Sequence, residues 1–153
     1  MRSVPVLLSV LLLTSLAAVG HGAEKKADAA HITVKDAWVL EVPPSSEMSA
    51  AYMKIENSSA KGSTLVAAQS DVARVVELHK MSDEGGMMKM EKVAQIQVPA
   101  KGSVALESGG LHIMLIGLQR KLKQGDQVTL TLRFEDGTEE KVVAPVRKRS
   151  EME

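Results

Sequence analysis

Two histidines and two methionines carry the chemistry that the sequence suggests most strongly: His79, Met90, His112 and Met114. Imidazole nitrogen binds several transition metals, whereas thioether sulfur is a soft, neutral ligand that selects Cu(I) over Zn²⁺, Mg²⁺ or Ca²⁺. Only the histidines can be protonated, so copper affinity should weaken as the pH falls toward about 5. A site without an anionic ligand leaves Cu(I) its positive charge, which suits transfer to a partner better than storage.

The second histidine and the second methionine are two residues apart in the apolar run 111–118. Side chains of a β-strand alternate between its two faces, so His112 and Met114 are expected to leave the same face. Ile113 and Leu115 are then expected to point into the core. The pair forms half of a metal site on one strand.

The first histidine ends the segment 75–79. The same alternation predicts that Val76 and Leu78 face inward and that Glu77 and His79 face outward. This reasoning places His79 at the surface, near the end of a strand.

The segment that follows is rich in methionine and contains a glycine turn at 85–86. We expect a hairpin that returns Met90 beside His79, with Met88 and Met90 on one face of the returning strand. Met81 and Met88 are expected to be accessory or alternative ligands. The competing interpretation is that both are exposed loop residues without a metal role.

Each of these residues also has an ordinary structural explanation when taken alone. Methionine often fills gaps in a core, and a histidine on a strand is usually structural or exposed. Met48 and Met53 flank an expected strand and are interpreted as packing residues, and His31 is expected to be exposed. The prediction of a metal site therefore depends on the combination of residues.

The composition excludes several classes of protein. The 153 residues include 19 basic and 19 acidic residues, so the formal net charge is zero and no basic patch suggests a nucleic-acid partner. Cysteine is absent, which removes disulfides, thiolate sites, blue-copper centres and a lipid-carrying cysteine. No G-x-S-x-G motif or catalytic triad is visible. We therefore expect a binding protein and not an enzyme.

The amino terminus has the pattern of a signal peptide. Arg2 precedes a short apolar run and small residues, which predicts a signal peptide over 1–20, cleaved after Gly20 or as late as Ala23. The alternative is an uncleaved membrane anchor, but the run is shorter than the roughly 20 residues that span a bilayer. Cleavage after Gly20 would leave His21 at the mature terminus, where its amine and imidazole could chelate Cu(II) as a second site.

Short apolar runs separated by turn residues fill the rest of the chain. Such spacing predicts an all-β sandwich or barrel in a single domain at 31–147, followed by a charged, frayed tail at 148–153. A short helix near 71–75 is also expected. The expected strands are 31–40, 50–56, 64–68, 75–79, 87–93, 96–98, 104–106, 111–118, 127–134 and 141–146.

The ligand spacing resembles a family signature. The pattern His79-x10-Met90-x21-His112-x-Met114 is similar to the motif of the periplasmic PCuAC copper chaperones, and the resemblance extends from about residue 32 to residue 145. The surrounding segments that share it are Asp36-Ala37-Trp38, Ala51-Tyr52-Met53, Val76-Glu77-Leu78-His79, the Gly-Gly-Met turn, the run 112–118 and Phe134-Glu135-Asp136-Gly137.

The resemblance implies a cupredoxin-like Greek-key β-sandwich that binds one Cu(I) through the four side chains. It further implies a periplasmic chaperone that delivers copper to the dinuclear copper centre of cytochrome c oxidase subunit II. A periplasmic copper buffer or resistance protein without an oxidase target would use the same ligands. A structural β-sandwich with methionine in its core would bind no copper.

Overall fold

The computed structural model describes residues 31–151, which form ten β-strands and one short 3₁₀ helix. The expected signal peptide, its cleavage points at Gly20 and Ala23, and His21 lie outside the described residues. No helix within the described part is long and apolar enough to cross a membrane. The strands are β1 Ile32–Leu40, β2 Met48–Asn57, β3 Ser63–Ser70, β4 Ala73–Glu84, β5 Met87–Lys92, β6 Ile96–Val98, β7 Gly102–Leu106, β8 Leu111–Leu118, β9 Gln127–Phe134 and β10 Glu139–Arg147.

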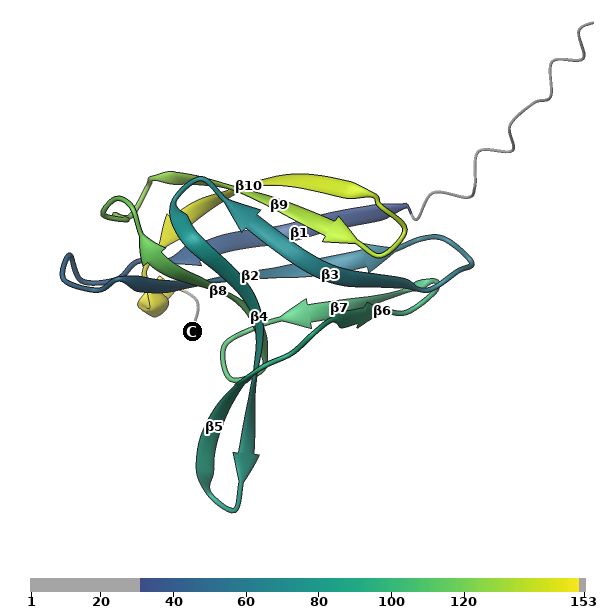
Figure 1. The fold of residues 1–153 in the computed structure, drawn as a ribbon, viewed down its shortest axis with the longest axis horizontal. Coiled ribbons are helices and arrows are strands. Elements are labelled where there is room, and N and C mark those ends of the chain that lie inside the picture. The colour runs from purple at the N-terminus through teal and green to yellow at the C-terminus, as the bar shows by residue number, and fades with distance from the viewer. Residues whose placement is uncertain (1–30, 152–153) are drawn as a thin grey trace, which may run out of the picture.

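A continuous hydrogen-bonded path joins the strands in the order β5-β4-β8-β2-β1-β10-β9-β3-β6, and β7 pairs with β2. Within the described chain every pairing is antiparallel except that of β1 with β10. The path curls over so that β3 and β9 share one core with β1, β2 and β8. The predicted all-β sandwich is confirmed, and Figure 1 shows the β4–β5 hairpin projecting from it.

The core between the layers is mainly aliphatic. The predicted alternation of β9 is confirmed, because Leu130 and Leu132 are fully buried and Phe134 is nearly so. From the opposite layer Ile113 and Leu115 are also fully buried. These residues anchor β8, the strand that carries half of the candidate site.

The turn before β4 differs from expectation. The short helix expected near 71–75 is wrong, because Asp71 and Val72 form a turn and β4 begins at Ala73. The backbone N–H of Val72 donates to Ser70 Oγ at 3.4 Å, and such local bonds from serine favour turns over helices.

The carboxyl-terminal tail also differs from expectation over its described part. It was expected to be frayed, but Arg149–Glu151 forms the 3₁₀ helix η1. The side chain of Arg149 lines a cleft on the outer face of the β8–β2 layer.

A bulge in β1 changes which side chains enter the core. Asp36 has a φ of 51°, and the register between β1 and β2 shifts between Lys35 and Trp38. Val34 packs against the core before the bulge, whereas Val39 does so after it and Trp38 belongs to a separate cluster. The extra residue therefore turns Trp38 to the outer face, as β-bulges often do for single side chains.

Candidate metal site

The two histidines of the predicted site lie directly opposite each other on neighbouring strands. His79 of β4 pairs with His112 of β8, and their ring centroids are 5.8 Å apart with the planes inclined by 52°. Leu78 and Ile113 point to the core on the other face, as predicted. His79 is not at a strand end, however, because β4 continues to Glu84. Its side chain is only 13% exposed.

The two methionines lie on the same face of the same group of strands. Met114 is opposite Glu77, two residues before His79 on β4. Met90 is opposite Met81, two residues after His79. Because cross-strand partners share a face, the structure brings all four predicted ligands to one face of β5, β4 and β8. The predicted common face of Met88 and Met90 is confirmed by the same register.

A cleft of about 390 Å³ lies on this face beside the histidine pair. Its wall includes His112 and five thioethers, namely Met48, Met81, Met88, Met90 and Met114. The interpretation of Met53 as a packing residue is confirmed, since it is 3% exposed in the core. The same interpretation of Met48 is wrong, because it is 50% exposed and lines the cleft.

An aromatic row continues from the histidines across the outer face. Tyr52 lies with its ring centroid 6.2 Å from that of His112 and 4.7 Å from that of Trp38. With Ala50 these aromatics form an apolar cluster separate from the main core. Of this cluster, Tyr52 and Ala50 line the cleft on the side of β2.

His112 is held with one ring nitrogen available. The residue is 4% exposed, and its Nδ1 lies 3.1 Å from the carbonyl oxygen of Gly110. A carbonyl only accepts, so Nδ1 carries the proton and Nε2 keeps its lone pair. Burial lowers the pKa of His112, a hydrogen bond to Gly110 opposes this shift, and the nearby His79 lowers the pKa further. The result favours a neutral imidazole, the form that binds metals.

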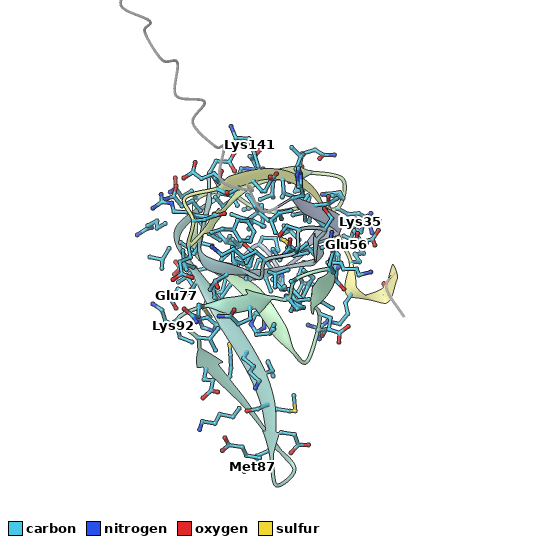
Figure 2. The ribbon with its side chains drawn as sticks, turned by 90° about the vertical axis from the view of Figure 1, so that its right-hand side faces the viewer. Lys35, Glu56, Glu77, Met87, Lys92 and Lys141 are labelled. Carbon is cyan, nitrogen blue, oxygen red and sulfur yellow. The ribbon has the colours of Figure 1, made fainter. Side chains whose placement is uncertain are left out.

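His79 is held through its other nitrogen. Its Nε2 lies 2.9 Å from Glu77 Oε2, and Glu77 Oε1 accepts a second hydrogen bond from Lys92 Nζ at 2.7 Å. These bonds, from His79 first and Lys92 second, lower the pKa of Glu77 and keep it a carboxylate. Figure 2 shows Glu77 and Lys92 side by side at the base of the hairpin.

The remaining nitrogen of His79 has no hydrogen-bond partner. Nδ1 is a buried polar atom that no described residue contacts as a donor or acceptor. Such an atom carries an uncompensated desolvation cost and calls for an explanation, of which a bound ion is one. Nδ1 of His79 and Nε2 of His112 are therefore the ring nitrogens left without a hydrogen-bond partner among the described residues, and each could serve as a metal ligand.

Comparison with known proteins places the chain in a family. A family profile described as "LpqE-like: Putative lipoprotein LpqE-like" matches residues 32–146. The chain belongs to the LpqE-like family. A relative named "Putative lipoprotein Lxx21020", from Leifsonia xyli subsp. xyli, is 34% identical over 124 residues, which cover 80% of this LpqE-like chain and 72% of the relative.

Solved structures confirm the predicted resemblance of this LpqE-like chain to PCuAC domains. The solution structure of CuI-DR1885 from Deinococcus radiodurans is 38% identical with a TM-score of 0.65, covering 83% of this chain and 86% of that one. The copper-bound PCuAC domain of PmoF2 has a TM-score of 0.65 at 22% identity, covering 76% of this chain and 92% of that one. The second match, at its lower identity, supports the cupredoxin-like fold alone.

The described part of this LpqE-like chain contains no cluster of carboxylates and histidines of the kind that binds hard metals. Among residues 31–151 no three side chains of histidine, aspartate or glutamate are grouped as a metal site. The thioethers that line the cleft are soft donors, which suit a soft metal better than a hard one.

Sequence reasoning missed several residues of this LpqE-like site. It placed Glu77 outward but gave it no role, and it gave Lys92 none. The alternation of β2 could have indicated Tyr52. Met48, Ala50 and Tyr52 lie on one face of β2, and Ala50 pairs with Met114, which shares the outer face of β8 with His112. No comparable signal existed for Trp38, whose orientation depends on the bulge.

Proposed function

We propose that this chain is a periplasmic copper chaperone. It binds one Cu(I) through His79, Met90, His112 and Met114 and delivers it to the dinuclear copper centre of cytochrome c oxidase subunit II. The observation that carries the proposal is the cross-strand histidine pair, in which each ring has one hydrogen-bonded and one free nitrogen. Thioethers on the same face complete the donor set.

The separation of the two rings supports binding of a single ion between them. A metal–imidazole bond is about 2.0 Å long, so two rings that bind one ion have centroids roughly 5 to 6 Å apart, depending on the angle between the two bonds. The observed separation is 5.8 Å. This separation of the rings is compatible with one nitrogen of each binding the same ion.

The donor set supports Cu(I) as the cargo. The carboxylate in this part of the face, Glu77, is already hydrogen-bonded to His79 and Lys92, which leaves neutral nitrogen and sulfur as the available donors. Such a set binds Cu(I) in preference to Zn²⁺ or Ca²⁺. Met81 and Met88 line the same cleft and can act as accessory or exchanging ligands.

Exposure of the thioethers supports transfer over storage. Met90 is 47% exposed and Met88 is 56% exposed, so an incoming ligand from a partner protein can reach the metal without unfolding of the hairpin. Ligand exchange at a neutral, open site lets copper pass from one protein to the next. A copper buffer without an oxidase target remains the alternative function.

Features typical of an exported protein support a periplasmic location. The family and the Leifsonia relative both carry the word lipoprotein in their descriptions, and the amino-terminal pattern is that of a signal peptide. The sequence contains no cysteine, so thioether-linked lipid has no attachment residue within it.

The first experiment is an anaerobic titration of the protein with Cu(I) against a chromophoric Cu(I) chelator. We expect one equivalent to be retained, and X-ray absorption should count nitrogen and sulfur ligands in similar numbers. A protein that competes for no Cu(I), or a spectrum with only nitrogen and oxygen around copper, contradicts the proposal.

A second experiment separates delivery from buffering. Deleting the gene should lower oxidase activity in cells grown at low copper, and added copper should restore that activity. Unchanged oxidase activity together with lost copper tolerance would instead identify a buffer.

A further inference from the structure

We propose that Glu77 is a positioning residue that makes His79 bind Cu(I) through Nδ1, whereas His112 binds through Nε2. The inference rests on the proposed function and adds to it the ligating atom of each histidine. It also assigns a role to Glu77 and to Lys92, which touch no copper themselves.

The hydrogen bond from His79 to Glu77 fixes the tautomer of the ring. Glu77 Oε2 is 2.9 Å from Nε2, and a carboxylate can only accept, so the proton of neutral His79 resides on Nε2. The two residues are two apart on β4 and therefore share its outer face. This bond orients the ring and raises the basicity of the opposite nitrogen, as carboxylates do in other metal sites.

Lys92 holds the carboxylate from the second strand of the hairpin. Its Nζ donates to Glu77 Oε1 at 2.7 Å, so each oxygen of the carboxylate has its own donor. Lys92 lies opposite His79 in the β4–β5 pairing and two residues after Met90. The arrangement Lys92–Glu77–His79 therefore ties the strand that carries Met90 to the imidazole.

The free nitrogen of His79 is the one that faces a buried position. Nδ1 lies out of contact with solvent and has no partner among the described residues. The ring of His112 is its aromatic neighbour at 5.8 Å, and there the assignment is reversed, because Gly110 binds Nδ1. The hydrogen-bond acceptor is a carboxylate for His79 and a backbone carbonyl for His112. Within the described chain the nitrogen without a partner is therefore Nδ1 in His79 and Nε2 in His112.

The test begins with the protein before copper is added. Two-bond ¹H–¹⁵N correlation spectra of the ¹⁵N-labelled protein, near neutral pH, report which nitrogen of each ring is protonated. We expect the Nε2–H tautomer for His79 and the Nδ1–H tautomer for His112. Anaerobic addition of Cu(I) as its acetonitrile complex should then shift Nδ1 of His79 and Nε2 of His112.

Variants of Glu77 test the positioning role. Glu77→Ala should mix the two tautomers of His79 and lower Cu(I) affinity by about 10- to 100-fold, the range seen when partners of metal ligands are removed. Glu77→Gln should restore much of both properties, because its amide oxygen can still accept from Nε2. Glu91→Ala is the matched control, since Glu91 pairs with Lys80 on the other face of the hairpin and its loss changes the net charge equally.

The outcomes separate this inference from the proposed function. Copper that shifts Nε2 of His79, or a Glu77→Ala protein with the tautomer and affinity of Glu91→Ala, overturns the inference and leaves copper binding intact. A protein that binds no Cu(I) overturns the proposed function. The tautomers of the apo protein still decide whether Glu77 orients His79, and thermal unfolding of each variant checks that the fold is retained.

Discussion

The two faces of the β4–β8 layer differ in the types of side chain that they present and in what surrounds those side chains. The inner face presents Leu78, Ile113 and Leu115, all at most 3% exposed and packed in the aliphatic core. The outer face presents His79 and His112, with one free nitrogen each, and the thioethers of the cleft. Adjacent residues of one strand therefore face different surroundings, one the core and the next the cleft. Because strand side chains alternate, changes to one face should affect stability and changes to the other should affect binding.

The largest effect is expected on the inner face. Leu115→Ala removes a fully buried side chain and should lower the free energy of unfolding by roughly 2–5 kcal/mol. Urea titration monitored by circular dichroism measures this change. The folded fraction should keep its Cu(I) affinity, so a variant with normal stability and lost copper binding would contradict the separation of the two faces.

The next effect is expected at His112. Replacing His112 by Ala removes a proposed metal ligand and should lower Cu(I) affinity more than about 100-fold, the upper end of what loss of an outer partner costs. Competition with a chromophoric chelator measures the affinity. His31→Ala is the control, because His31 is exposed outside the strands of the site and should change nothing.

A smaller effect distinguishes the two methionine environments. Met114→Leu should cost less than about 1.5 kcal/mol of stability because the volumes are similar. It should lower Cu(I) affinity by about tenfold, equivalent to about 1.4 kcal/mol. Met53→Leu, on the inner face of β2, should leave affinity unchanged. Equal affinities of the two variants would remove Met114 from the ligand set.

The smallest effect concerns pH and the apo protein. Burial is the main cause that places the pKa of folded His112 below its ordinary value of 6.5, so the unfolded chain binds more protons in the window just below pH 6.5. The contribution of neutral His112 to the free energy of unfolding is therefore fully present above pH 6.5, and it is lost as the pH falls through the pKa of the folded state. Urea midpoints between about pH 5 and 7 should rise with pH more steeply for the wild type than for His112→Gln. Identical slopes would show that His112 is not the group responsible.

Much of the fold followed from local pattern. The strands 96–98, 111–118 and 127–134 have the predicted bounds, because each alternates or is apolar between clear turn residues. The extension of β4 to Glu84 was missed. Its last residues are polar and belong to a hairpin outside the core, so no buried face imposes a pattern on them.

The candidate site was predicted less completely than the fold. The common face of His79, His112 and Met114 follows from strand alternation, and the register between β4 and β8 places them together. The position of Met48 in the cleft depends on which strands become neighbours. Several neighbours in this sheet, such as β8 with β4 and with β2, are not consecutive in the chain, and no local signal specifies them.

The bulge of β1 makes the face on which each later side chain lies depend on the number of residues that precede it. With one extra residue at Asp36, the strand supplies Val34 and Val39 to one side and Trp38 to the other. Deleting a residue between Lys35 and Trp38 would reverse every later position, moving an indole into the aliphatic interior and a valine into the aromatic row. At this segment the number of residues therefore constrains the protein more tightly than the identity of any one of them, whereas in the loops length is free to vary.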